Sequence, residues 1–252
     1  ALSESQLRRS PPLARAKGQL REGFSYVAGR RDLLIALGVA FAVGTFGLNF
    51  QMTNALMVRG EFGMGAESYG LLGSIMGIGT LLGALLAARR ATVPSLRFVV
   101  GSATTVGVLI IVSGLSPTYH WYALGLPVIG LASLLTLTAT NMYLQTSVDQ
   151  QVRGRVMALY MTVLMGGTPV GAPLLGWLAE LLGPRAPLVG GGLLQLATIG
   201  LVILAVRTLR AAATQPAGAE PSSSASSETI STTSASSNDQ AASTVASQTV
   251  LR

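Results

Sequence analysis

The chain has 252 residues, of which 50% are hydrophobic and only 11% are charged. Soluble domains carry about 25% charged residues, so this composition argues against a water-soluble globular protein and indicates a membrane protein. The sequence contains no cysteine, which excludes disulfides and thiolate chemistry within these residues.

The first segment, residues 1–32, is basic and precedes the first long apolar stretch. After a double proline, apolar residues recur at helical spacing with charged residues between them: Leu13, Leu20, Phe24 and Val27. This pattern predicts a short amphipathic helix on the cytoplasmic surface of the membrane. An ordinary linker helix is the alternative.

Five stretches without Asp, Glu, Lys or Arg follow, at 33–58, 68–88, 98–148, 156–179 and 186–206. A bilayer core needs about 20 such residues per helix. The third stretch is long enough for two helices, and "SPTYHW" at 116–121 supplies turn residues and interfacial aromatics to divide it. We therefore expect an all-α membrane protein with a domain at 33–206 and six transmembrane helices, numbered spans one to six, at 33–58, 68–88, 96–116, 121–146, 156–180 and 186–206.

The last segment, residues 207–252, is rich in Ser, Thr and Ala, as in "PSSSASSETISTTSASS". It has too few large apolar side chains to pack a core, which predicts a disordered cytoplasmic tail.

The basic residues of the short connections are distributed unequally between the two sides of the membrane. Seven precede span one, three lie between spans two and three, two follow span four and two follow span six, whereas the opposite side has Arg59 and Arg185. The positive-inside rule then predicts a multi-pass protein of the plasma (cytoplasmic, or inner) membrane with both termini in the cytoplasm. The net charge of +7 follows from this topology, and no motif predicts a nucleic-acid partner.

Polar residues within the predicted spans are concentrated in spans one and four. The substrate-cavity candidates are Thr45, Asn49, Thr53, Asn54, Thr138, Asn141 and Gln145. Each such group needs a partner or a water-filled cavity inside a bilayer. The alternative is that these amides and hydroxyls only join helices to one another. Since no charged residue lies clearly within a span, the sequence predicts no evident proton relay.

Glycine and proline mark two spans for close packing or bending. The residues are Gly73, Gly77, Gly79 and Gly83 in span two, and Pro169, Gly171 and Pro173 in span five. Small residues let helix backbones approach closely, and proline kinks are tolerated in membrane helices. Simple helix packing without motion is the alternative.

Three passages, "REGFSYVAGRRDLL", "YGLLGSIMGIGTLLGALLAARR" and "NMYLQTSVDQQVRGRVMALY…GGTPVGAPLLGWLAELLGPR", resemble the C-terminal half of a major facilitator superfamily transporter. The similarity is to the branch that contains enterobactin exporters and macrolide efflux proteins. It implies that spans one to six correspond to helices seven to twelve, of which seven and ten line the central cavity. The "LLAARRATVPSLR" loop lacks the aspartate that usually heads the superfamily's loop motif.

The resemblance implies a proton-driven secondary exporter of hydrophobic or amphipathic small molecules, such as siderophores or drugs (multidrug efflux). Its expected partners are the lipid bilayer, a small-molecule substrate, and either a missing N-terminal six-helix half or a second copy. The alternative is a non-transporting orphan half or truncated segment. His120 is the only histidine and has no acidic or cysteine neighbours, so no enzyme chemistry, metal or cofactor is expected.

Charged residues beside spans two, four and five are candidates for a cytoplasmic gate. They are Arg89, Arg90, Asp149, Arg153 and Arg155. The passage "VDQQVRGR" places Asp149 four residues before Arg153, and arginine can bridge a carboxylate and several carbonyls at once. A latch that closes the cytoplasmic side is the functional interpretation. A positive-inside anchor with a solvated ion pair is the alternative.

Overall fold

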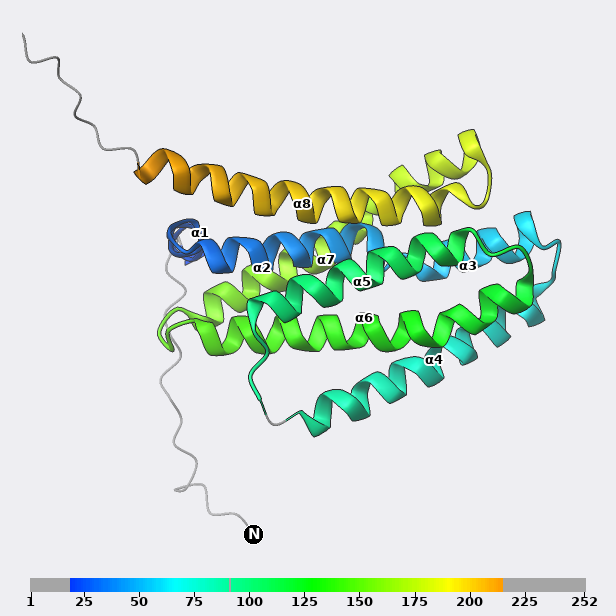
Figure 1. Ribbon diagram of the computed structural model, residues 1–252, viewed down its shortest axis with the longest axis horizontal. Coiled ribbons are helices and arrows are strands. Elements are labelled where there is room, and N and C mark those ends of the chain that lie inside the picture. Colours follow the sequence, from blue (N-terminus) through cyan, green and yellow to red (C-terminus); the bar gives the residue numbers. More distant parts are fainter. Residues whose placement is uncertain (1–18, 91, 215–252) are drawn as a thin grey trace, which may run out of the picture. The chain divides into compact units, whose positions relative to one another are not determined.

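A computed structural model describes residues 19–90 and 92–214; residues 1–18, 91 and 215–252 lie outside the described part, and with them most of the predicted linker and tail. All secondary-structure elements of the described chain are helices, joined by short loops (Figure 1). The helices are α1 (Gln19–Gly29), α2 (Arg31–Ala42), η2 (Val43–Gly47), α3 (Phe50–Leu56), η3 (Met57–Glu61), α4 (Ala66–Arg89), α5 (Leu96–Gly114), α6 (Tyr119–Ser147), α7 (Arg153–Leu182) and α8 (Ala186–Thr214).

Six segments of the described chain are long and apolar enough to cross a membrane. Span one consists of α2, η2, α3 and η3 together, and spans two to six are α4, α5, α6, α7 and the part of α8 up to Thr208. The prediction of an all-α membrane protein with six transmembrane helices is confirmed.

The ends of the spans are set by local signals that the sequence carries. Ser95 caps α5, because its hydroxyl accepts a hydrogen bond from the backbone N–H of Phe98 at 3.3 Å. Gly63 and Gly183 follow spans one and five with φ of 61° and 91°, a region that favours glycine. Helix α8 runs to Thr214, beyond the predicted end at 206, because the three alanines after Arg210 are strong helix formers.

Span one lies at the centre of the packing and α4 at its margin. In the most apolar part of Arg31–Glu61, 67% of the residues are buried, compared with 17% for Ala66–Arg89. Helix α2 contacts α5, α6, α7 and α8, whereas α4 packs mainly on α6. In Figure 1, α6 accordingly lies between α4 and α5.

The contact between α4 and α6 depends on small residues from both helices. A Cβ on Gly83 would lie 2.9 Å from the carbonyl oxygen of Leu131, and one on Gly130 would lie 2.5 Å from that of Met76. Gly79 likewise packs on the backbone of α6. Of the four predicted packing glycines of α4, therefore, Gly79 and Gly83 lie in a helix contact. Gly73 and Gly77 have nothing within 4 Å of where a Cβ would be.

Because the spans alternate in direction, one end of the bundle collects most of the arginines. We call this the basic end; it contains the starts of α2, α5 and α7 and the ends of α4, α6 and α8, and lies at the left of Figure 1. The arginines of this end whose side chains are described are Arg30, Arg31, Arg89, Arg90, Arg97, Arg153, Arg155 and Arg207.

Helix α1 precedes span one at the basic end. Val27 is buried in a cluster with Leu33 and Leu144, whereas Phe24 remains 61% exposed. The helix therefore anchors one apolar side chain in the bundle and presents another outward.

Candidate functional site

Span one is interrupted near its middle. Helix α2 passes into the π-helix η2, and the helical pattern then breaks at Leu48 and Asn49 before α3 begins at Phe50. π-Helical turns are rare and occur frequently at functional sites. In transporters, interrupted membrane helices expose backbone groups where substrate or ions bind.

The interruption is packed against glycines of α7. A Cβ on Gly167 would lie 2.6 Å from Thr45 Oγ1 and 2.8 Å from the Thr45 backbone nitrogen, and Gly171 packs on the carbonyl oxygen of the same threonine. Thr168 donates a hydrogen bond to the carbonyl of Gly44 at 3.2 Å. Only residues without a side chain allow the two backbones to approach this closely.

The predicted cavity residues of span one are all buried. Asn49 donates to the carbonyl of Thr45 at 2.7 Å, and Thr53 donates to that of Asn49 at 3.2 Å. Asn54 accepts a hydrogen bond of 2.6 Å from the hydroxyl of Tyr122 in α6. The side chains of Asn49 and Thr53 therefore bond within span one, whereas that of Asn54 bonds to another helix.

The predicted cavity residues of span four lie on a different surface. Thr138 and Gln145 are exposed and Asn141 is half-buried, and the Gln145 amide donates to Asn141 Oδ1. Their spacing of three and four residues places them on one face of α6. The structure thus does not bring the span-one and span-four candidates together in one open cavity.

Two buried polar atoms near the interruption have no hydrogen-bond partner among the described residues: Thr45 Oγ1 and Gln195 Oε1. Gln195, in α8, is fully buried, and its amide nitrogen donates to the carbonyl of Ala103 at 2.9 Å. A Cβ on Gly47 would lie 2.9 Å from the unpaired oxygen, so Gln195 faces η2. Gln195 is not among the predicted cavity residues, although a single amide in an apolar span is a signal for such a site.

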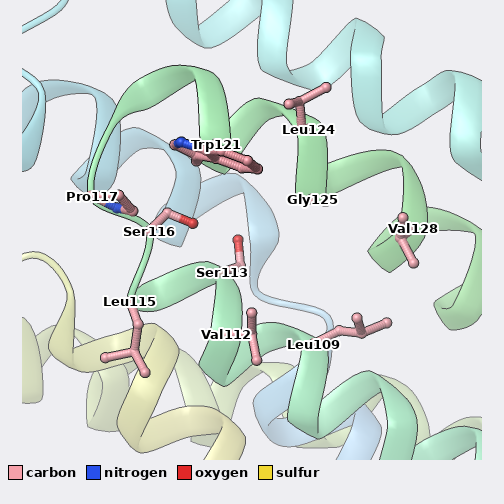
Figure 2. Close-up of a pocket in the computed structure, with 10 residues that line it drawn as sticks. All are labelled: Leu109, Val112, Ser113, Leu115, Ser116, Pro117, Trp121, Leu124, Gly125 and Val128. Carbon is pink, nitrogen blue, oxygen red and sulfur yellow. The ribbon is translucent and has the colours of Figure 1, made fainter.

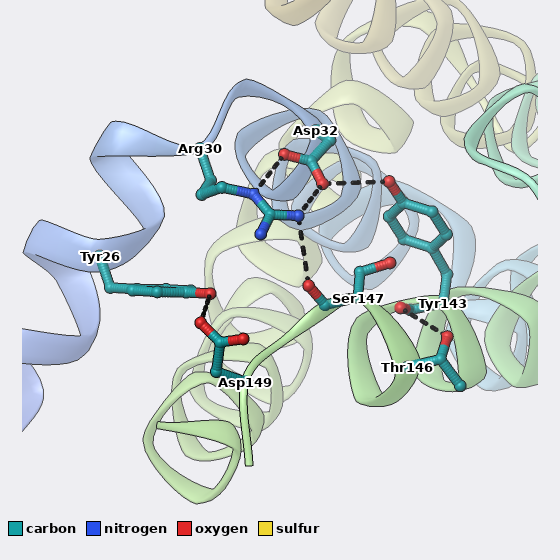
Figure 3. A network of polar contacts seen from close by, with 7 residues as sticks. All are labelled: Tyr26, Arg30, Asp32, Tyr143, Thr146, Ser147 and Asp149. Atoms are coloured by element: carbon teal, nitrogen blue, oxygen red, sulfur yellow. Dashed lines mark hydrogen bonds and ion pairs between the residues drawn. The ribbon is translucent and has the colours of Figure 1, made fainter. Parts of the chain in front are cut away.

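A polar network at the basic end joins span one to span four (Figure 3). Arg30 forms a bidentate pair with Asp32 at 3.0 and 2.7 Å and donates to the carbonyl of Ser147 at 3.2 Å. Tyr143 donates to the same carboxylate at 3.3 Å. The hydrogen bond to Asp32 raises the pKa of Arg30 above its ordinary value. We call Arg30, Asp32, Tyr143 and Ser147 the basic-end network. None of these four residues is among the site residues predicted from the sequence.

Of the predicted gate residues, Asp149 lies beside this network (Figure 3). Asp149 accepts a hydrogen bond of 2.9 Å from the hydroxyl of Tyr26 in α1, so the loop after α6 is joined to the helix before span one. Arg153 is exposed and Arg155 is half-buried, both in the first turn of α7. Arg90 lies elsewhere, with its guanidinium 3.7 Å from the ring centre of Phe98, and Arg89 is exposed beside it.

The predicted kink residues of α7 do not end the helix. Pro169 and Pro173 lie inside α7, which runs without a break from Arg153 to Leu182, and both are exposed. Within the described residues no three His, Cys, Asp or Glu side chains are placed to hold a metal ion.

A pocket of about 510 Å³ opens between α5 and α6 at the end opposite the basic end (Figure 2). Its lining carries no charge and is apolar apart from two serines, and Trp121 lies across it. Ser113 Oγ points into this pocket, is buried, and has no partner among the described residues.

Comparison with known proteins extends over nearly the whole chain. Residues 4–233 match the family of transmembrane secretion effectors, which are transporters of the major facilitator type. No curated protein and no solved structure matches the chain. Since the match covers more than half of the sequence, the chain belongs to the transmembrane secretion effector family.

Proposed function

We propose that this chain is a secondary active exporter of hydrophobic or amphipathic small molecules, such as siderophores or drugs, driven by protons. The observation that supports it best is the interruption of span one, where Thr45 and Asn49 lie at a break in the most buried helix. Interrupted helices with polar backbone near the bilayer midplane form the substrate sites of many transporters.

The proposal gives the polar residues of spans one and four separate roles. Asn141 and Thr138 on α6 offer polar contacts at the surface of the unit, and Asn49 offers them at the break once α7 moves aside. A site that pairs apolar walls with a few polar groups suits an amphipathic substrate.

The test is an export profile. Asn49→Ala, Thr53→Ala and Asn141→Ala should each change which compounds of a panel are exported, at an unchanged protein level in the membrane. Thr198→Ala is the matched control, since that hydroxyl only bonds to a carbonyl of its own helix, α8, at 2.7 Å. Unchanged profiles at normal abundance would favour the helix-joining interpretation and contradict the proposed site.

We further propose that the unit works against a second six-helix unit, either an N-terminal half or a second copy. Gly73 and Gly77 leave the outer face of α4 bare, and Met161 and Met165 are exposed on α7. Small residues on an outer helix face suit contact with another helix. Transport by the chain reconstituted alone supports a second copy. Transport only after co-expression of an N-terminal six-helix half supports that half as the partner. If neither experiment gives transport, the result supports a non-transporting segment.

The orientation in the plasma membrane is also a proposal, with the basic end in the cytoplasm. It rests on the excess of arginine at that end. Because the chain has no cysteine, single cysteines report accessibility directly. A membrane-impermeant maleimide added to intact cells should label Ser116→Cys and leave Ser95→Cys unlabelled; the reverse pattern would invert the topology.

A further inference from the structure

Two grooves flank α5 at the basic end. One, of about 370 Å³, lies between α5, α2 and α8 and is lined by Ile35, Leu96, Arg97, Val100, Gly101, Ile203 and Arg207. The other, of about 500 Å³, lies between α5 and α6. Arg97 and Gly101 line both grooves, so the two hollows meet across one turn of α5.

At Gly101 the ridge between the grooves has no side chain, and the side chain of Arg97, one turn before it, lines both grooves. A Cβ on Gly101 would have nothing within 4 Å. The walls on either side are mostly apolar, with Val100 and Ile203 in one groove and Leu131 and Leu135 in the other, where Ser102 and Thr105 add two hydroxyls. Two apolar hollows that meet at a bare ridge fit a ligand with two hydrocarbon chains.

The mouth of this double groove is positively charged. Arg97 and Arg207 come from different helices, line the same groove and are both exposed. The carboxylates of Asp32 and Glu61 form ion pairs with other arginines, Arg30 and Arg185. A guanidinium binds a phosphate through two parallel hydrogen bonds, so two of them favour a phosphate group.

We propose that this double groove binds one anionic phospholipid of the surrounding bilayer, with its phosphate between Arg97 and Arg207 and one acyl chain in each groove. Basic pockets between membrane helices bind anionic headgroups. The pocket of Figure 2 is comparable in volume but has no cation in its lining, so it offers nothing to select a headgroup.

The experiment uses the full chain purified in detergent. Bound lipid is measured by native mass spectrometry, and the melting temperature is measured with added phosphatidylglycerol, phosphatidylcholine or inorganic phosphate. Wild-type protein should retain phosphatidylglycerol and melt at a higher temperature with it than with phosphatidylcholine. Arg97→Gln with Arg207→Gln should weaken phosphatidylglycerol binding roughly 30-fold, from a factor of about five for each arginine near an anionic surface.

One control variant and one further test variant separate this site from general electrostatic attraction. Arg59→Gln with Arg89→Gln removes the same charge from two exposed arginines outside the groove and should leave binding unchanged. Gly101→Leu keeps both cations but fills the ridge, and it should also weaken lipid binding. Equal loss in the charge control, equal stabilisation by phosphatidylcholine, or full stabilisation by inorganic phosphate would each overturn the proposal.

Discussion

Gly166 and Gly167 are neighbours in α7 that differ in what a side chain would meet. A Cβ on Gly167 would lie 2.6 and 2.8 Å from two atoms of Thr45, one of them in the backbone. A Cβ on Gly166 would have nothing within 4 Å. We therefore expect Gly167→Ala to separate α7 from the π-helical turn of span one, and Gly166→Ala to leave that contact intact.

The two substitutions should change the free energy of unfolding in opposite directions. Replacing glycine by alanine inside a helix gains about 0.5–1 kcal/mol, because alanine loses less backbone entropy. Forcing a methyl group into a packed contact costs about 1–3 kcal/mol. Gly166→Ala should thus raise the free energy of unfolding by up to about 1 kcal/mol. Both variants gain the same helix propensity from alanine, so this gain cancels when their free energies of unfolding are subtracted. The remaining difference is the packing cost at Gly167, about 1–3 kcal/mol.

The assay is the unfolding of purified protein by SDS in mixed micelles, followed by helical circular dichroism. A second matched pair, Gly171→Ala and Gly176→Ala, repeats the comparison one turn further along, since Gly171 packs on Thr45 and Gly176 has nothing within 4 Å. A difference of less than about 0.5 kcal/mol within both pairs, which is the usual error of additivity, would refute the close contact.

Three further substitutions test other parts of the molecule. Tyr122→Phe removes the 2.6 Å hydrogen bond to Asn54 and should lower the free energy of unfolding in SDS by about 0.6 kcal/mol, the average for such bonds in membranes; no change would mean that the bond is not formed. Asp32→Asn removes the carboxylate of the basic-end network and should reduce export driven by an imposed proton gradient at normal membrane abundance, whereas wild-type export would exclude a role in coupling. Arg153→Lys with Arg155→Lys keeps the charge, so an anchor tolerates it, while a latch that needs the guanidinium fork loses export.

The number and type of the membrane helices could be predicted because the bilayer fixes both. A span needs about 20 apolar residues, and the sequence contains such stretches separated by charges or turn residues. The interruption at Leu48 and Asn49 could not be predicted in the same way, since no proline marks it. It lies where η2 packs on Gly167 and Gly171 of α7, and the sequence separation of more than 100 residues hides that contact from any local pattern.

The basic-end network was missed for a different reason. The predicted spans begin after the last charged residue, so Asp32 was counted as part of the cytoplasmic segment. In the structure it lies in the first turn of α2, and its hydroxyl donor, Tyr143, is 111 residues away. The sequence did contain one usable signal: Arg30 and Asp32 stand two residues apart at a helix start, where an acidic side chain is favoured and a basic one nearby can pair with it.

The hydrogen bonds of span one bear on whether its polar residues serve to join helices or to bind a ligand. Residues that join helices should bond across the interface, as Asn54 does to Tyr122. Thr45 Oγ1 instead lies against the bare backbone of Gly167 and has no partner among the described residues. A buried hydroxyl without a partner costs about 1–3 kcal/mol, and an apolar residue of similar size would avoid that cost. The helix-joining role therefore accounts for Asn54, while the unpaired hydroxyl at the break supports a site that opens when α7 moves away from span one.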